Sequence, residues 1–250
     1  MKLADDCVCA EVKDGKMYCA NYSIVTFSTG VLQAAIRGDQ NSVKFEPPLP
    51  RWKQDAINHI TPIVYGKIFL VFPTTFWNEI DGDQQLLGYV ADEKGYYGHY
   101  ILDKNRPNTI TVDVSGNLAI KIATQSQEET VNEVMAILRK IFNNVTLPEP
   151  ESVVISRWHL DPLFLHSYSD YGPGVPESVF DDLLKPVNGR LYFAGEALNS
   201  SNYGNVQGAY GTGVYAAQQI TGTSNSAGVP QATLVCVFVA GVLSLLSVVQ

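Results

Sequence analysis

One lysine stands where the surrounding sequence predicts a buried strand. Residues 63–72 form an apolar run, and strand alternation places Lys67 on the same face as Tyr65 and Phe69. A lysine among such side chains is costly to bury unless it has a partner or a chemical role. Lys67 is therefore a candidate reactive residue, and the alternative is a lysine at a strand edge that reaches solvent.

A carboxylate follows a second predicted strand. The apolar residues 191–194 precede Gly195 and Glu196, and a helix is expected from about Val206. The unpaired amides and positive dipole end of a helix start favour negative charge nearby. Small residues there let a flat ring approach the backbone: Gly204, Gly208, Ala209, Gly211 and Gly213. The segment predicts contact with a large cofactor. The alternatives are glycines that serve only helix packing and a Glu196 that only caps a helix.

Residues 189–220 resemble the C-terminal flavin-contacting motif of the flavin-dependent amine oxidases. Residues 22–33 and 155–174 are similar to two further segments of this family, and residues 45–77 resemble its polyamine-oxidase branch. The resemblance implies an FAD enzyme that removes hydride from a carbon beside a secondary amine of a polyamine. Imine hydrolysis and reoxidation by oxygen, with release of H2O2, would complete the reaction.

The resemblance also implies roles for individual residues. Lys67 would hold a water against the flavin N5, and Tyr168 would stand beside the flavin and orient the amine, with Tyr65 on the substrate side. Asn205 occupies the place of the second ring of an aromatic pair, so it is expected to face the substrate as a small polar residue. The implied FAD contacts are Ala194, Gly195, Glu196, Asn205, Val206, Gln207, Gly208 and Ala209.

Three residues depart from the patterns of this family. Ser167 stands where monoamine oxidases have a cysteine that bonds to the flavin, so the FAD is expected to be bound non-covalently. His166 replaces a usual glycine, and His159 replaces a usual tryptophan. Both histidines are predicted to be packed surface residues, and the alternative is a titrating histidine near the flavin.

The predicted fold is of the mixed α/β class. It combines a partial FAD-binding, Rossmann-like domain with a partial substrate domain, a mixed sheet flanked by helices. The strand and GxGxxG unit that open the family's nucleotide-binding fold are not found in the sequence, so the chain is expected to be the C-terminal half of an oxidase. The expected divisions are an FAD-binding part (1–38 and 185–222), a substrate domain (39–184), a linker (223–231) and an apolar tail (232–249).

Several elements follow from periodicity. Amphipathic or short helices are expected at residues 51–60, 127–142 and 177–185, and strands at 86–90, 96–102, 109–114 and 153–158. A hairpin is expected to turn at Asp14-Gly15. With a two-residue loop Ala10 faces Cys19, so Cys19 points to the opposite face from Cys7 and Cys9 and a disulfide within the hairpin is not expected.

Composition limits the partners. The 250 residues carry a net charge of −8, with 46% hydrophobic and 17% charged residues, which describes a globular protein. The acidic balance argues against nucleic acid and is compatible with cationic substrates. The cysteines lack the spacing of metal ligands, so no metal site is predicted.

The end of the chain predicts attachment to a membrane. Residues 232–249 carry no charge and follow a run of small residues. This pattern fits either a glycosylphosphatidylinositol signal or a single C-terminal span, with a buried helix as the third alternative. No secretory signal opens the chain. The expected location is a membrane of the cell surface or secretory pathway.

Two other functions remain open. The first is a membrane-tethered, non-catalytic remnant that binds polyamines or partners. The second is another oxidase of the superfamily, such as an L-amino-acid oxidase, which predicts an arginine that grips a substrate carboxylate. None of Arg37, Arg51, Arg106 and Arg139 lies in a flavin-facing segment.

Overall fold

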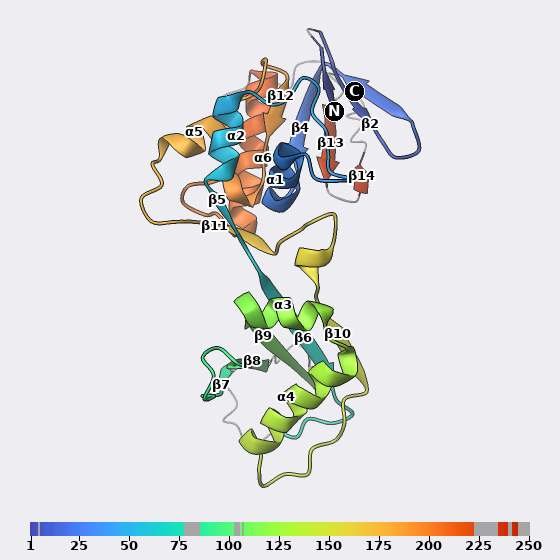
Figure 1. Ribbon diagram of the computed structural model, residues 1–250, viewed down its shortest axis with the longest axis vertical. Helices are drawn as coiled ribbons and strands as arrows, with labels where there is room; N and C mark the ends of the chain where they lie inside the picture. Colours follow the sequence, from blue (N-terminus) through green and yellow to red (C-terminus); the bar gives the residue numbers. More distant parts are fainter. Residues whose placement is uncertain are drawn as a thin grey trace. The chain divides into compact units, whose positions relative to one another are not determined.

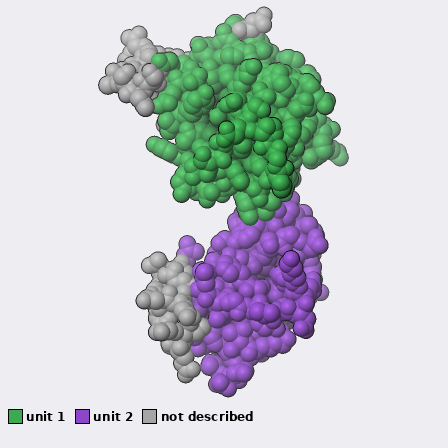
Figure 2. Space-filling view, turned by 90° about the vertical axis from the view of Figure 1, so that its left-hand side faces the viewer, with its two compact units in different colours: residues 1–63, 162–250 green, residues 64–161 purple. Residues whose placement is uncertain are grey.

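The computed structural model describes residues 1–4, 6–77, 86–102, 106 and 108–222, together with the backbone of residues 235–239 and 242–244. The chain divides into two compact units, unit 1 (residues 1–63 and 162–250) and unit 2 (residues 64–161) (Figure 2). The helices are α1 (Thr29–Arg37), α2 (Arg51–Asn58), α3 (Gly116–Thr124), α4 (Gln127–Ile141), α5 (Ser178–Leu184) and α6 (Val206–Thr221), with the short 3-10 helices η1 (Trp158–Leu160) and η2 (Glu196–Leu198) (Figure 1).

The strands of the described residues belong to four sheets. Those of unit 1 are β1 (Lys2–Leu3), β2 (Val8–Glu11), β3 (Met17–Ala20), β4 (Tyr22–Thr26), β5 (Ile60–Ile63), β11 (Tyr168–Tyr171), β12 (Leu191–Phe193), β13 (Val235–Val239) and β14 (Val242–Ser244). Those of unit 2 are β6 (Tyr65–Val71), β7 (Leu86–Gly88), β8 (His99–Leu102), β9 (Thr109–Ser115) and β10 (Ser152–Ile155).

The main sheet of unit 1 has the order β12-β4-β13-β14, and both β12 and β13 run parallel to β4. β4 is apolar and β-branched, and its Val25 is 1% exposed, as expected for a strand covered on both faces. Apolar side chains of α2, α5 and β12 form one buried cluster. α6 packs against β12 and η2 (Figure 1). This packing fixes the place where β12 ends and Glu196 follows.

The hairpin of β2 and β3 has a different turn from the predicted one. The Val12 amide donates to the Lys16 carbonyl at 3.0 Å, so three residues lie in the loop. Gly15 adopts a φ of +81°, the left-handed conformation that such a loop requires near its end. The loop is therefore one residue longer than the two-residue turn at Asp14-Gly15.

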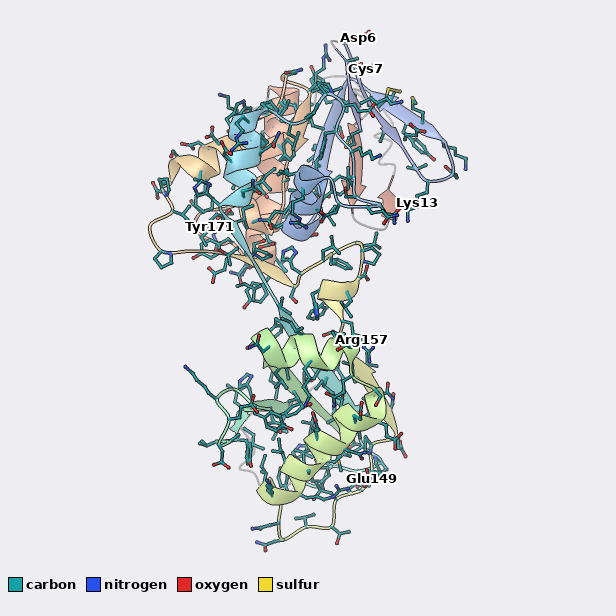
Figure 3. The ribbon with its side chains drawn as sticks, viewed as in Figure 1. Asp6, Cys7, Lys13, Glu149, Arg157 and Tyr171 are labelled. Carbon is teal, nitrogen blue, oxygen red and sulfur yellow. A yellow bond between two sulfur atoms is a disulfide. The ribbon has the colours of Figure 1, made fainter. Side chains whose placement is uncertain are left out.

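The longer loop changes which cysteines face each other. A one-residue change of register moves every side chain to the other face of a strand. Cys19 consequently lies opposite Cys9 instead of Ala10, and the two cysteines form a disulfide (Figure 3). The prediction that this hairpin holds no disulfide was wrong, while Cys7 lies outside the bond.

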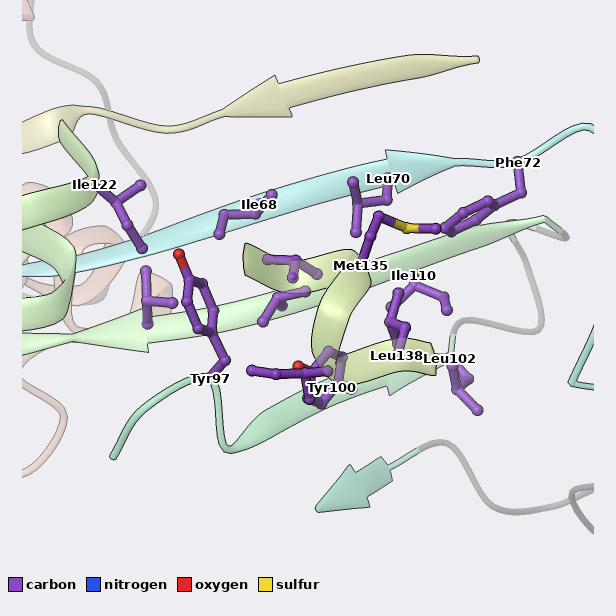
Figure 4. Close-up of a cluster of buried hydrophobic side chains, with 14 of the residues drawn as sticks. Ile68, Leu70, Phe72, Tyr97, Tyr100, Leu102, Ile110, Ile122, Met135 and Leu138 are labelled. Atoms are coloured by element: carbon purple, nitrogen blue, oxygen red, sulfur yellow. The ribbon is translucent and has the colours of Figure 1, made fainter. Parts of the chain in front are cut away.

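In its described residues, unit 2 is an antiparallel sheet of order β10-β6-β9-β8-β7 with the helices α3 and α4 and the short η1. α4 begins with a capping box, in which Ser126 and Glu129 bond to each other's backbone amides. Met135 and Leu138 of this helix join a buried cluster with residues of β6, β8 and β9 (Figure 4). The predicted helix 127–142 is confirmed apart from its last residue.

The predicted strand over residues 63–72 is two elements. β5 pairs with β11 in unit 1, and β6 begins at Tyr65 in the sheet of unit 2. Within β6 the burial alternates as predicted: Ile68 and Leu70 are buried, whereas Lys67 is only partly covered. The predicted mixed α/β class is confirmed by these sheets and helices.

The predicted apolar tail, residues 232–249, lies mostly outside the described residues. Its two described stretches are β13 and β14, whose backbone is extended, and β13 pairs along the length of β4. Of the helices that the structure describes, none combines the length and the apolar character that crossing a membrane requires. Membrane attachment stays a prediction, as does the division into FAD-binding and substrate domains.

Candidate functional site

The turn after β12 is bonded to α6. The hydroxyl of Thr212 lies 3.0 Å from both the amide and the carbonyl of Gly195, and this side chain is 3% exposed. Gly195 has a φ of 149°, in the range that favours glycine. Ala194, the residue before it, is buried and donates its amide to the Val25 carbonyl of β4. The backbone that carries Glu196 is thus held from two sides.

Glu196 joins three segments of unit 1. Its Oε1 accepts a hydrogen bond of 2.7 Å from the Ser169 hydroxyl of β11, and its Oε2 accepts one of 2.7 Å from the Gly204 amide. The Tyr171 hydroxyl of β11 also donates to the Ala197 carbonyl at 2.6 Å. Glu196 therefore closes the turn that leads to α6, ahead of the helix itself.

Tyr168, the first residue of β11, lies against this turn. A Cβ added to Gly204 would stand 3.3 Å from Tyr168 Cδ2 and 3.3 Å from the Ser169 carbonyl oxygen, and Gly204 has a φ of +72°. The left-handed conformation favours glycine here, and an added Cβ would press closely on Tyr168 and Ser169. The Tyr168 side chain is 38% exposed, so one part of the ring remains open to a ligand. The structure brings Tyr168 and Glu196 together in unit 1.

The start of α6 offers hydrogen-bond donors. Its N-cap residue, Asn205, donates its side-chain amide to the Tyr203 carbonyl at 2.9 Å, so among the described residues the cap side chain does not serve the first turn. The backbone amides of Val206 and Gln207 lie in this first turn, and Val206 is 83% exposed. Such a helix start can receive the electronegative edge of a ligand.

Of two glycines of α6 that face the preceding turn, one has no room for a side chain. A Cβ on Gly208 would come within 2.2 Å of the Asn202 carbonyl oxygen, and one on Gly211 would contact the Asn199 side chain at 3.6 Å. At Gly208 the packing of the preceding turn is by itself sufficient reason for glycine. The predicted flavin contact of Gly208 stays a prediction beside this packing role.

Lys67 lies in unit 2 and has a carboxylate partner. Its Nζ is 3.4 Å from Asp113 Oδ1, and Asp113 Oδ2 is 2.9 Å from His99 Nδ1. The three residues face one another across β6, β9 and β8. The Lys67 side chain is 32% exposed, and its Nζ lies 5.8 Å from the Tyr65 ring. Lys67 is therefore a paired, partly exposed cation on an inner strand.

Sequence reasoning missed the residues behind Glu196. Thr29, His166 and Ser169 are each at most 2% exposed and form a hydrogen-bonded cluster that ends at Glu196. His166 is buried, so its prediction as a packed surface residue was wrong. The burial of Ser169 follows from strand alternation after the exposed Tyr168, which is the one signal that could have revealed it.

A cavity of about 440 Å³ lies elsewhere in unit 1, between α5 and α6. Glu177 and Asp181 line it on the α5 side, and Thr212 and Tyr215 on the α6 side. Its lining does not include Glu196, Tyr168 or the first turn of α6 in the described residues. The cavity is therefore separate from the predicted flavin contacts.

The site fits a flavin. The donors at the start of α6 match the electronegative pyrimidine end of the ring, and the Glu196 carboxylate matches the hydroxyls of a ribityl chain. At Gly195, an added Cβ would meet no described atom within 4 Å, which leaves room for a ligand against the backbone. The residues that would hold the cofactor are those of the turn 194–196 and of the α6 start.

Comparison with known proteins agrees with this fit. Residues 2–221 match the family model for flavin containing amine oxidoreductases. Polyamine oxidase 1 of Zea mays is 36% identical over 214 residues, which cover 84% of this chain and 41% of that protein. Polyamine oxidase 7 of Oryza sativa subsp. japonica is 35% identical over 84% of this chain and 43% of its own length. The chain thus spans less than half of these relatives.

Solved structures with low sequence identity share the fold. A redesigned putrescine oxidase superposes with a TM-score of 0.70 at 21% identity and covers 88% of this chain and 47% of the other. A cyclohexylamine oxidase from Brevibacterium oxydans gives a TM-score of 0.67 at 18% identity, over 88% and 46% of the two chains. The likeness extends over both units of the chain.

Proposed function

Because the chain belongs to the flavin containing amine oxidoreductase family, we propose that it provides the flavin-facing C-terminal part of an FAD-dependent polyamine oxidase. The observation that carries the proposal is the Glu196 carboxylate, held between Ser169 and Gly204 beside the exposed start of α6. The identity with plant polyamine oxidases supports the substrate class.

The residues around Glu196 would hold FAD without a covalent bond. The Ser167 hydroxyl stands where a covalent flavin link would need a cysteine thiol. Glu196 would accept hydrogen bonds from the ribityl chain, and the amides of residues 206–208 would donate to the pyrimidine edge and stabilise negative charge on it. When bound, FAD supplies the acceptor for hydride from the carbon beside the amine nitrogen, and oxygen then takes the electrons as H2O2.

Tyr168 and Lys67 carry the chemistry of the proposal. The partly exposed Tyr168 ring would orient the amine, which must be in its neutral form for hydride to leave the carbon beside it. By the family resemblance Asn205 would take the place of the second ring, so that the substrate would meet one ring and a small amide instead of two rings. Lys67 would hold the water that hydrolyses the imine, with Asp113 as the partner of its charge.

A non-catalytic, membrane-tethered remnant that binds polyamines is the second candidate. Location at the cell surface or in the secretory pathway, through the apolar segment 232–249, is part of both proposals. The Cys9–Cys19 disulfide supports it, because such bonds persist in oxidising compartments.

An absorption spectrum of the full chain, purified with added FAD, tests the main proposal. A bound flavin band that bleaches when spermine is added without oxygen supports an oxidase. Tyr168→Ala should slow this bleaching. The control is Tyr210→Ala, at a residue of α6 that is 75% exposed, and it should not slow the bleaching. Lys67→Met should leave the rate of bleaching unchanged and should slow the return of the flavin band when oxygen is admitted. A colourless protein contradicts the oxidase and favours the remnant.

A further inference from the structure

Glu196 is supported by a buried polar cluster that its role as a flavin contact does not explain. Thr29 comes from the first turn of α1, His166 from the loop before β11, and Ser169 from β11 itself. Their exposed fractions are 2%, 2% and 1%. Buried polar groups are costly unless they are hydrogen-bonded, so the bonds of this cluster are expected to be complete and directional.

The directions of the bonds follow from Glu196. Its carboxylate only accepts, so the Ser169 hydroxyl donates to Oε1 at 2.7 Å. The Ser169 oxygen is then left to accept. The Thr29 hydroxyl, at 2.8 Å, and His166 Nε2, at 3.4 Å, are placed to donate to it. An imidazole with its proton on Nε2 therefore fits this contact.

The other nitrogen of the ring gives the same answer. The Gly30 amide donates to His166 Nδ1 at 3.1 Å, which requires a lone pair on Nδ1. The Phe164 carbonyl, also 3.1 Å from Nδ1, already receives the Ser28 hydroxyl at 2.6 Å. An added Cβ on Gly30 would lie 2.7 Å from the Phe164 oxygen and 3.0 Å from Nδ1, so the start of α1 is packed tightly on this loop.

Protonation of the ring conflicts with this arrangement. A proton on Nδ1 would face the Gly30 amide, donor against donor, at the positive end of α1. Burial lowers the pKa of His166, while the Phe164 carbonyl and the Glu196 carboxylate raise it. On the described elements packed against the ring, Glu196 is the charged group that acts on it; α1 contributes the neutral Ser28 and Thr29, and β11 the neutral Ser169.

We propose that His166 is a positioning residue that acts through Ser169 on the Glu196 carboxylate, and that protonation of its imidazole weakens flavin binding. The first half of the proposal concerns the chain alone, and the second rests on the proposed function. When the ring gains a proton it loses its bond to Gly30 and moves, Ser169 loses a donor, and Glu196 loses the fixed orientation in which it receives the cofactor.

Two glycine amides report the two ends of the cluster. The Gly30 amide bonds to the imidazole and the Gly204 amide bonds to Glu196 Oε2 at 2.7 Å. In the full chain labelled with 15N-glycine, without FAD, both amide resonances should shift with the same midpoint as the pH is lowered from 8 to 5. Ser169→Ala should keep the shift of Gly30 and abolish that of Gly204. If the resonance of the Gly204 amide does not change with pH while that of the Gly30 amide does, the positioning role is wrong.

The flavin half is tested by binding. The dissociation constant of FAD for the full chain should rise about tenfold for each pH unit below the imidazole pKa, as expected when one proton opposes binding. His166→Gln can still accept from Gly30 and donate to Ser169 but does not titrate, so its affinity should be nearly independent of pH. The matched control is His59→Gln, an exposed histidine of the same unit, which should behave as the wild type.

The outcomes separate the two ideas. If His166→Gln keeps the pH dependence of the wild type, His166 does not control flavin binding and the second half of the proposal is wrong. If no variant binds FAD at any pH, the proposed function fails, while coupled shifts of Gly30 and Gly204 would still support the positioning of Glu196 by His166.

Discussion

Two lysines of this chain stand in opposite environments, and the sequence points to the wrong one as the buried cation. Lys67 lies in an apolar strand of unit 2, yet its side chain is 32% exposed and paired with Asp113 at 3.4 Å. Lys53 lies in the polar-looking helix α2 of unit 1 and is fully buried. Local pattern thus identifies which face of an element is apolar, but the burial of one charged group depends on what distant segments bring to it.

α5 supplies the partners of Lys53. Its Nζ donates to the carbonyls of Asp182 and Leu183 at 2.6 and 2.7 Å, near the C-terminus of α5, and lies 4.3 Å from the Phe193 ring centre. An ammonium at this end of a helix satisfies carbonyls that lack intrahelical partners and meets the negative end of the dipole. Lys53 therefore ties α2 to α5, beneath the strand that leads to Glu196.

The largest effect is expected from removal of the Lys53 side chain. Lys53→Ala leaves two carbonyls without their donor and opens a cavity, which should lower the free energy of unfolding by about 3 to 5 kcal/mol. Urea unfolding of the full chain measures it. Lys185→Ala is the matched control, because the ammonium groups of Lys53 and of the exposed Lys185 each lie 5.0 Å from the Trp52 ring centre. This substitution should lower the free energy of unfolding by less than about 1 kcal/mol. Equal stability of the two variants would contradict the role given to Lys53.

A smaller effect on the free energy of unfolding is expected from a change of pH. Burial lowers the pKa of Lys53 to about 7, an effect that nearby Asp182 opposes and Lys185 reinforces. In the unfolded chain the ammonium keeps its proton up to about pH 10.4, so the unfolded state binds more protons between these values and stability rises with pH.

The comparison with Lys53→Met isolates this contribution. The free energy of unfolding of the wild type, relative to the variant, should rise by about 2 kcal/mol between pH 7 and 9 and stay level below pH 7. If the difference is the same at both pH values, the carbonyls of α5 hold the ammonium charged, and its burial costs less than the lowered pKa implies.

Much of the fold could be predicted because its signals are local. The capping box at Ser126 and the apolar stripe of α4 fix that helix within the segment itself. The alternation of β6 placed Ile68 inward, and the apolar strand before Glu196 placed this carboxylate at a turn. Resemblance to a family predicted that Tyr168 and Glu196 serve one site, and the structure has both residues beside Gly204.

The missed features depend on register and on contacts between distant segments. One extra residue in the hairpin loop brought Cys9 opposite Cys19, and no strand pattern reports loop length to one residue. Asp113 became the partner of Lys67 through the pairing of β6 with β9, and His166 was buried by the start of α1, more than a hundred residues earlier in the chain. Such partners are set by tertiary packing.

The smallest effect on the free energy of unfolding is expected from the Lys67–Asp113 pair. Its size tests whether Lys67 stabilises the fold or is available for a catalytic role. A double-mutant cycle of Lys67→Met and Asp113→Asn should give a coupling energy of at most about 1 kcal/mol, as for other pairs near the surface. The reason is geometric: the pair is 3.4 Å apart, a third of the lysine is in solvent, and Asp113 keeps His99 at 2.9 Å when the lysine is removed. The exposed pair Arg139–Glu149 provides the control cycle.

A coupling energy above about 2 kcal/mol for the Lys67–Asp113 pair, well beyond that of the control pair, would make Lys67 a structural cation like Lys53. The difference between the two lysines would then vanish, and with it the argument that Lys67 is available to hold a water.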